Sequence, residues 1–575
     1  MSFIDWLLVV ALNGSIILFA VFYGRDTKTS SDWFLARRSL PWWIVGLSMY
    51  ATAIDASDLV ADSGGAYNFG LSLFAINWIG VITGWFFMSQ FIAIRMYREG
   101  MYTNAEYLEA RFTPAARMIS AFIQVIYRTV VMAIIGKTVY LTLEVVADWT
   151  PAFAASAVVV VAIIATFYTV IGGLRSVAIT DAMQSFIMLA ASFLLFFVVY
   201  QQVGGWAGVE RQLNEREHGL ADRVLHVGVS QTDELSLSGK SEDAAAALKK
   251  LGGTFDPQTN SIRTTTPAWV VCVYFAIAGM AYSVVNHTQV MRMLGSRSEW
   301  DLKMSVVVAG GVMLLITFAN LFIGIMGRAI YNLEGAEVDQ VFPNIVRDYT
   351  SAGLKGIVVA GIIAASFSTY DSIGSTLSAL LTRDVYARLF VQNREEAHYL
   401  QVGRWLTPVI IFGSFVYVPF LHGDGMLLFF LDIVGAFVVP LLTVYLLGAL
   451  TRVHRKSAVI GMLVGVTYGV LFLISGSIAE RFGVAILRPP FANTYAVSMI
   501  SMLLTAGTMI AVSCVLGWEK SNTLHETDES GWLAESRSQI SIATPDTAIE
   551  STTIPFLLGA LVAGAGIALT IVVFW

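Results

Sequence analysis

Long apolar stretches separated by short polar segments repeat from one end of the chain to the other. A helix needs about 20 mostly apolar residues to cross a bilayer. By that measure fourteen segments qualify: 3–23, 41–63, 71–96, 116–142, 151–171, 181–202, 267–291, 303–328, 354–382, 402–421, 425–449, 456–476, 494–517 and 553–574. The pattern therefore predicts an all-α polytopic membrane protein with about fourteen transmembrane helices.

Basic residues gather in alternate connections between these segments. With fourteen crossings, the connections rich in Lys and Arg all fall on one side of the membrane: Arg25 to Arg38, Arg95 to Arg117, Arg175, Arg292 to Lys303, Arg383 to Arg404 and Arg452 to Lys456. Because Lys and Arg are enriched in cytoplasmic loops, we expect that side to face the cytoplasm. The protein itself is expected in the plasma membrane. Both termini and the long polar segment 203–266 are then expected outside.

One predicted helix carries a stripe of hydroxyls and an acid. In residues 361–386, Ser368, Ser372 and Ser375 share a helical face, and Asp371 adjoins them. Such oxygens suit a small cation, and an ionisable group at bilayer depth indicates a functional site. The alternative is that the hydroxyls bond their own carbonyls one turn back and let helices pack closely.

Three acids, Asp55, Asp58 and Asp62, lie within another segment that must span the membrane. They are tolerable if the helix is broken near residues 51–56 and its freed carbonyls face a water-filled cavity. Alternatively, Asp58 and Asp62 lie at the outer surface where the helix ends. We expect this second arrangement for Asp62 and leave both open for the other two acids.

Two further charged residues lie deep in apolar segments. Arg128 follows Arg117 by eleven residues, or about 16 Å of helix, which puts it near the midplane, where it requires an anion. The anion is an intramembrane aspartate, another structural partner or the substrate, with structural pairing as the default. Asp432 lies more than a turn inside another apolar run.

Composition narrows the function. The chain is 56% hydrophobic and 13% charged, and its net charge of −6 forms no basic face, so no nucleic-acid partner is expected. The sequence contains no zinc-ligand spacing, phosphate-binding loop, nucleophile elbow or kinase motif, so an enzyme is not expected. The polar linker 518–552 is expected to be cytoplasmic and flexible.

Five motifs in order resemble the sodium:solute symporter family, which includes the sodium-glucose cotransporters. They are WFLARRSLPWW (33–43), YTNAEYLEARF (102–112), FYTVIGGLRSVAITDAMQ (167–184), NHTQVMRML (286–294) and SFSTYDSIGSTLSALLTRDVY (366–386). The resemblance implies a LeuT-like fold with a 5+5 inverted-repeat core and a broken first core helix. The repeats would be residues 41–202 and 267–450, with an extra helix and loop in 1–40, an extracellular loop in 203–266 and extra helices in 451–575.

The resemblance also implies site residues. Positions that match the family's main sodium site are the carbonyls of Ala51, Ile54 and Ala365 with the hydroxyls of Ser368 and Thr369. Some members hold a second sodium ion, and the matching positions are Asp181, Asp371 and Ser372. Substrate positions are Asp58, Asn77 and Asp432, with Tyr282 as the inner gating aromatic and Arg128 as a further candidate.

The implied function is symport of sodium with a small polar organic solute, by alternating access. The overall pattern favours a sugar or polyol, although the acids and amide also suit an amine, and Arg128 keeps a carboxylate or amino acid open. An uncoupled channel or membrane sensor with the same fold is also compatible with the sequence, as is proton coupling through Asp181 and Asp371.

Overall fold

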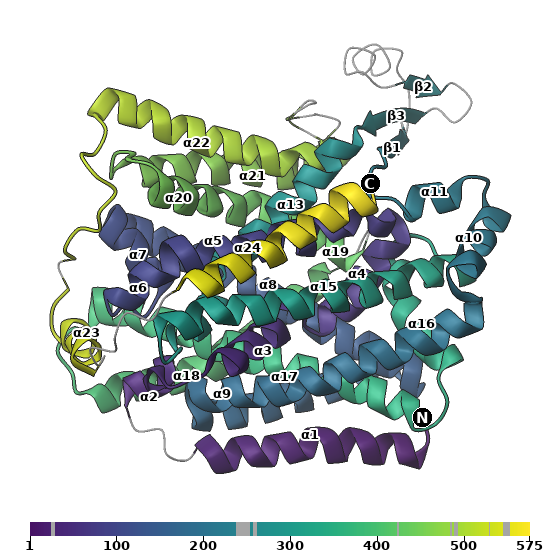
Figure 1. Ribbon diagram of the computed structural model, residues 1–575, viewed down its shortest axis with the longest axis horizontal. Coiled ribbons are helices and arrows are strands. Elements are labelled where there is room, and N and C mark those ends of the chain that lie inside the picture. The colour runs from purple at the N-terminus through teal and green to yellow at the C-terminus, as the bar shows by residue number, and fades with distance from the viewer. Residues whose placement is uncertain are drawn as a thin grey trace.

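The computed structural model describes residues 1–24, 29–236, 254–256, 261–421, 425–482, 486–487, 491, 493–527, 529–543 and 552–575. The molecule is a bundle of long helices (Figure 1). In the first half of the chain they are α1 (Phe3–Gly24), α2 (Ser30–Leu35), α3 (Trp42–Ala53), α4 (Ala56–Phe69), α5 (Ile82–Phe87), α6 (Ala93–Arg98), α7 (Asn104–Arg111), α8 (Pro114–Ala147), α9 (Pro151–Val203), α10 (Gly205–Arg216) and α11 (Leu220–Val224).

The second half has a similar series: α13 (Ala268–Val285), α14 (His287–Leu294), α15 (Glu299–Ile330), α16 (Val341–Tyr349), α17 (Leu354–Leu380), α18 (Glu396–Gly413), α19 (Met426–Ile433), α20 (Val439–Leu450), α21 (Ser457–Phe482), α22 (Val497–Leu516), α23 (Trp532–Ala543) and α24 (Thr553–Ala568). Several helices continue as π-helical turns, among them Ala75–Val81 before α5 and Leu381–Phe390 after α17.

The sequence pattern missed a small antiparallel sheet. It consists of β1 (Gln231–Ser236), β2 (Thr254–Asp256) and β3 (Ser261–Thr266), with β3 in the middle. The sheet lies within the long polar segment between α11 and α13, outside the helical bundle (Figure 1). Every candidate membrane span of the described chain is helical.

The helices account for the fourteen expected crossings. Within the described residues, twelve helices are long and apolar enough to span a membrane, and α3 with the helix that follows forms a bent pair at 54°. One of the twelve, α9, has 53 residues and would be about 80 Å long as a single rod. It is interrupted at Gly173, whose φ of 61° leaves the helical region, so its two halves are separate crossings.

The basic connections meet at one end of the bundle, as the charge pattern predicted. Leu40 pairs with Ser296 as an isolated β-bridge, Arg98 forms an ion pair with Glu299, and Arg455 Nε donates to the Phe112 carbonyl at 3.2 Å. We call this the basic end; α2, α6, α7 and α23 lie there (Figure 1). Both chain termini lie at the opposite end, together with α10, α11 and the sheet.

The helix is interrupted near the start of each expected repeat, after α3 and after α13. Between α3 and α4, Ile54 has extended backbone, and the Asp55 carboxylate caps α4 by accepting from Ser57 N at 2.8 Å. Between α13 and α14, Asn286 has φ −66° and ψ 99°, and its side chain caps α14 by accepting from Thr288 N at 3.1 Å. The first break was predicted, whereas the second falls in a segment expected to be continuous.

Candidate functional site

A cavity lies beside the first break. The space inside it that the centre of a water molecule can occupy is about 50 Å³, room for a few water molecules in this arrangement of the helices. The wall is mostly apolar and comes from α4, α8, α13, α19 and the turns at 75–81. The polar lining residues are Asp55, Ser57, Asp58, Asp62, Asn77 and Tyr282.

The three acids of this region differ in how they are held. Asp55 and Asp58 form a capping box, in which Asp58 Oδ2 accepts from Asp55 N at 2.6 Å. Asp62 was expected at the outer surface, and this expectation is wrong: it is 8% exposed and lines the cavity. Because the break bends the chain, the first turns of α4 face the cavity and bring Asp58 and Asp62, one turn apart, to the same wall.

Close packing of two backbones positions Asn77 and Tyr282. A Cβ on Gly279 would lie 1.9 Å from the Ile76 carbonyl oxygen, and one on Gly80 would lie 2.5 Å from that of Ala276. Only glycine allows this approach, which sets the turns at 75–81 directly against α13. Tyr282, on α13, donates its hydroxyl to the Thr52 carbonyl at 3.1 Å and so closes the cavity toward the end of α3.

Arg128 lies behind the tyrosine wall. It is 1% exposed, and all three of its guanidinium nitrogens lack a hydrogen-bond partner among the described residues. The guanidinium carbon lies 5.5 Å from the ring centroid of Tyr127 and 5.7 Å from that of Tyr282. A buried guanidinium with spare donors is costly unless an anion is near, and the Asp55 and Asp58 carboxylates are close enough to interact with it electrostatically.

Two of the oxygens expected at the main sodium site lie close together across two helices. Ser368 Oγ on α17 lies 3.2 Å from the carbonyl oxygen of Ala51, in the last turn of α3. Thr369 Oγ1 donates to the Ala365 carbonyl one turn back in its own helix, at 3.1 Å, as the alternative reading of the hydroxyls expected, and Ile54 is the residue at the break. All five residues are buried. The Ala51 carbonyl at the break and the Ser368 hydroxyl of α17 thus face each other, and neutral, hard oxygens of this kind suit sodium.

Two of the residues suggested for a second sodium ion, Asp181 and Ser372, contact an arginine. Asp181 Oδ2 lies 2.8 Å from Arg292 Nη2, which also donates to Ser372. Asp371 accepts from the Tyr168 hydroxyl at 2.8 Å and from Ser372 at 3.0 Å. A guanidinium therefore already supplies a positive charge between Asp181 and Ser372.

Two placements differ from the sequence-based picture. Arg292 was counted with a loop, but α14 carries it into the interior, where it is 0% exposed. The only sequence signal was the spacing of NHTQVMRML, in which Arg292 falls among residues of a short buried helix. Asp432 lies on α19, but the residues of this helix that line the cavity are Met426, Leu427, Phe430 and Leu431.

Comparison with known proteins assigns the chain to a family. The model of the sodium:solute symporter family matches residues 33–465. The chain belongs to the sodium:solute symporter family. Members of this family are transporters, so the protein is a multi-pass membrane transporter and not an enzyme.

The relatives extend over most of the chain. A sodium/glucose cotransporter of Vibrio parahaemolyticus is 26% identical over 504 residues, which cover 82% of this chain and 85% of the relative. A sodium/myo-inositol cotransporter of Homo sapiens is 25% identical over 500 residues, 81% of this chain and 66% of the relative. Among solved structures, a sodium-coupled sialic acid symporter superposes with a TM-score of 0.70 at 18% identity, covering 90% of this chain and 99% of the other, which shows the shared fold.

Proposed function

We propose that this protein couples the movement of sodium ions down their gradient to the uptake of a small polar organic solute, with a sugar or polyol as the favoured class. One observation carries the proposal: the broken end of α3 presents the Ala51 carbonyl to the Ser368 hydroxyl of α17, next to a cavity lined by acids and an amide. The named activities of its sugar and inositol relatives support the same class of solute.

The main sodium ion would be held by the carbonyls of Ala51, Ile54 and Ala365 and the hydroxyls of Ser368 and Thr369. When bound there, sodium supplies a positive charge that links α3 to α17. Neutral ligands fix no permanent charge in the site, so the ion can also leave. Such a link stabilises the broken helix in one arrangement and thereby the cavity that its first turns line.

In the solute pocket, Asp58, Asp62 and Asn77 would accept or donate hydrogen bonds to hydroxyl groups, while Tyr282 closes the pocket toward α3. The apolar part of the wall, from α8 and α19, would cover the ring or carbon face of the solute. Asp432 would act from behind this wall.

A second candidate is a solute that also carries a carboxylate, such as a sugar acid or an amino acid. Arg128 favours it, because its guanidinium nitrogens lack hydrogen-bond partners among the described residues and its flanking Tyr282 lines the cavity. A carboxylate that reached Arg128 would satisfy those donors. In the sugar case the charge of Arg128 balances Asp55 and Asp58 instead.

We further propose that the protein lies in the plasma membrane, that its basic end faces the cytoplasm and that both termini lie outside the cell. The two repeats are assigned to residues 41–202 and 267–450. A second sodium ion at Asp181, Asp371 and Ser372 would require Arg292 to move aside first, since its guanidinium stands between Asp181 and Ser372.

The solute class is tested by thermal stability of the purified protein. Sugars, polyols, carboxylates and amines are each added in sodium and in potassium buffer, because a ligand that binds only the folded state raises the melting temperature. We expect one neutral hydroxylated class to stabilise the protein in sodium and not in potassium. Stabilisation by carboxylates alone, lost in Arg128→Gln, would replace the sugar assignment with the acid one.

A further inference from the structure

The segment between α22 and α24 is not a free linker, as its composition suggested, but lies against the basic end of the bundle. Its described residues, 518–527 and 529–543, include α23, and we call them the strap. Trp532, Leu533 and Ile540 of α23 are at most 4% exposed. These residues lie beyond the part of the chain that the family model matches, so they are a feature of this chain beyond the matched core.

The strap contacts the first repeat at several points. His525 N donates to the Ala110 carbonyl at 2.7 Å, and the Tyr102 hydroxyl donates to the Ser536 carbonyl at 3.2 Å. The Glu529 carboxylate accepts from Arg117 Nη1, on α8, at 2.7 Å.

The strap also contacts the second repeat. Arg383, in the π-helical continuation of α17, donates to Ser536 Oγ at 3.1 Å. Trp532 N donates to the Gln392 carbonyl at 3.2 Å, and its ring stacks on Tyr399 with centroids 4.0 Å apart. The strap therefore joins elements of both repeats at one end of the bundle.

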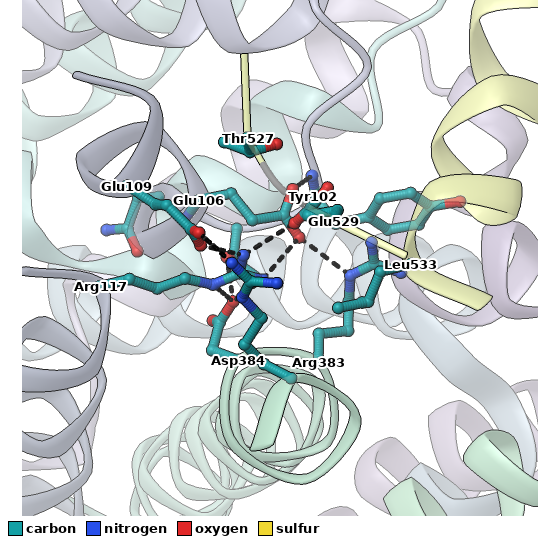
Figure 2. A network of polar contacts seen from close by, with 12 residues as sticks. Tyr102, Glu106, Glu109, Arg117, Arg383, Asp384, Thr527, Glu529 and Leu533 are labelled. Atoms are coloured by element: carbon teal, nitrogen blue, oxygen red, sulfur yellow. Dashed lines mark hydrogen bonds and ion pairs between the residues drawn. The ribbon is translucent and has the colours of Figure 1, made fainter. Parts of the chain in front are cut away.

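Between these contacts lies a buried network of charges, which Figure 2 shows in close-up. Arg117 is fully buried and faces four acids: Glu106 at 3.5 Å, Glu109 at 2.7 Å, Asp384 at 2.6 Å and Glu529 at 2.7 Å. Arg383, Arg388 and Arg537 pair with acids of the same network. Four acids and four arginines balance, and the strap supplies one of each, Glu529 and Arg537.

The network seals the basic end. Arg117, Glu106 and Asp384 are at most 1% exposed, so the centre of the network is buried from solvent, while Arg388 and Arg537 lie at its partly exposed rim. Alternating access requires the two repeats to separate on one side of the site at a time. Opening the basic end would then pull Glu106 and Arg117 of the first repeat away from Arg383 and Asp384 of the second.

The same helix links the seal to the sodium site. Arg383 follows Thr369 by 14 residues, about 21 Å along α17 and its continuation. A movement of this helix that releases the sodium oxygens also moves Arg383 and Asp384 against the strap.

We propose that the strap is a conformational latch that holds the basic end closed and limits how often the state open to that end forms. The inference rests on the proposed transport by alternating access. The strap bonds to the first and second repeats at the same time only while the basic end is closed. These bonds therefore stabilise the closed state relative to the state open at that end.

The test measures access to the sealed region and needs no knowledge of the solute. Cys272 and Cys514, the native cysteines, are replaced by alanine, and Ser120→Cys is added on α8, where Ser120 is fully buried one turn from Arg117. The rate of labelling by a polar maleimide then reports opening of the basic end. Glu529→Gln removes the charge but keeps the shape of the side chain, whereas Glu535→Gln removes an exposed acid of α23 and serves as the matched control.

We expect Glu529→Gln to raise the labelling rate about tenfold or more, which corresponds to about 1.4 kcal/mol of lost stabilisation of the closed state. Glu535→Gln should leave the rate within twofold of the parent. If Glu529→Gln fails to fold, Arg537→Gln at the partly exposed rim of the network replaces it, with a rise in the same direction.

Equal labelling rates in the Glu529→Gln or Arg537→Gln variant and in Glu535→Gln would overturn the latch. Failure of the proposed symport is seen separately, as loss of sodium-dependent stabilisation by every solute in a chain whose labelling still responds to Glu529→Gln.

Discussion

Replacement of Ser368 by alanine probes the sodium site through one oxygen. The Ser368 hydroxyl lies 3.2 Å from the Ala51 carbonyl and 2.6 Å from Asp181 Oδ1, in a fully buried position. In the variant, the sodium ion loses one of five ligands. Asp181 keeps its contacts with Arg292 and Ser48, so the variant is expected to fold.

The size of the effect follows from the charge of the ion. A polar contact to a charged group inside a protein contributes about 1.5 to 3 kcal/mol, so the sodium concentration for half-maximal uptake should rise about 10- to 150-fold. Once sodium is saturating, the half-saturation for the solute should change little, since the pocket wall is untouched.

Uptake into liposomes is measured over a range of sodium concentrations at constant ionic strength. Ser366→Ala is the matched control, because Ser366 is also buried on α17 but its hydroxyl donates only to the Ile362 carbonyl of its own helix, at 2.8 Å. A Ser368→Ala protein with the sodium half-saturation of the parent would refute the assignment of this oxygen, and an equal shift in Ser366→Ala would mean that the effect is general loss of packing.

Three further predictions concern other parts of the molecule. Asn77→Ala should raise the solute concentration for half-maximal uptake about tenfold and leave the sodium value unchanged, and a shift in both would contradict its place in the solute pocket. Arg292→Gln leaves Asp181 buried without its cation, so it should lower the free energy of unfolding by about 3–5 kcal/mol in potassium. Sodium should restore part of the melting temperature, and equal stability in both salts would argue against cation binding there. Burial raises the pKa of the Asp339 carboxyl from 3.8 to about 6, although it accepts from Met426 N at the start of α19. Because the folded state holds this proton more tightly than the unfolded chain, protonated Asp339 stabilises the fold fully below about pH 4, and this stabilisation is lost as the pH rises through 6. The melting temperature of the parent minus that of Asp339→Asn should therefore be larger at pH 4 than at pH 7.5. A difference that is the same at both pH values would contradict the raised pKa.

Features that depend on local sequence could be predicted. The break of the first core helix follows from acids that cannot sit in a continuous lipid-facing helix, and Asp55 is found capping the new helix. The hydroxyl face of α17 follows from helical periodicity, and the structure places Ser368 against the predicted broken end. That the basic connections meet at one end of the bundle also follows from the sequence, because two membrane crossings separate each basic connection from the next.

Features that depend on distant partners could not be predicted. Arg292 and Asp181 lie 111 residues apart, and nothing in either local sequence indicates that α14 turns the arginine inward. The second break, at Asn286, contains no charge that would have excluded a continuous helix. The polar composition of the strap does not distinguish a segment that is free in solvent from one that is docked, because docking depends on single residues such as Trp532.

The central claim, sodium-coupled symport, is tested most directly by uptake into liposomes that contain the purified protein and carry an imposed inward sodium gradient. Radiolabelled sugars, polyols, carboxylates and amino acids are supplied in turn. The structure and the family predict transient accumulation of one class, a sugar or polyol, above its external concentration, and its loss when potassium replaces sodium or when Ser368 and Thr369 are both changed to alanine. Accumulation that is unchanged in potassium, or equilibration without accumulation for every class despite correctly inserted protein, would contradict the claim.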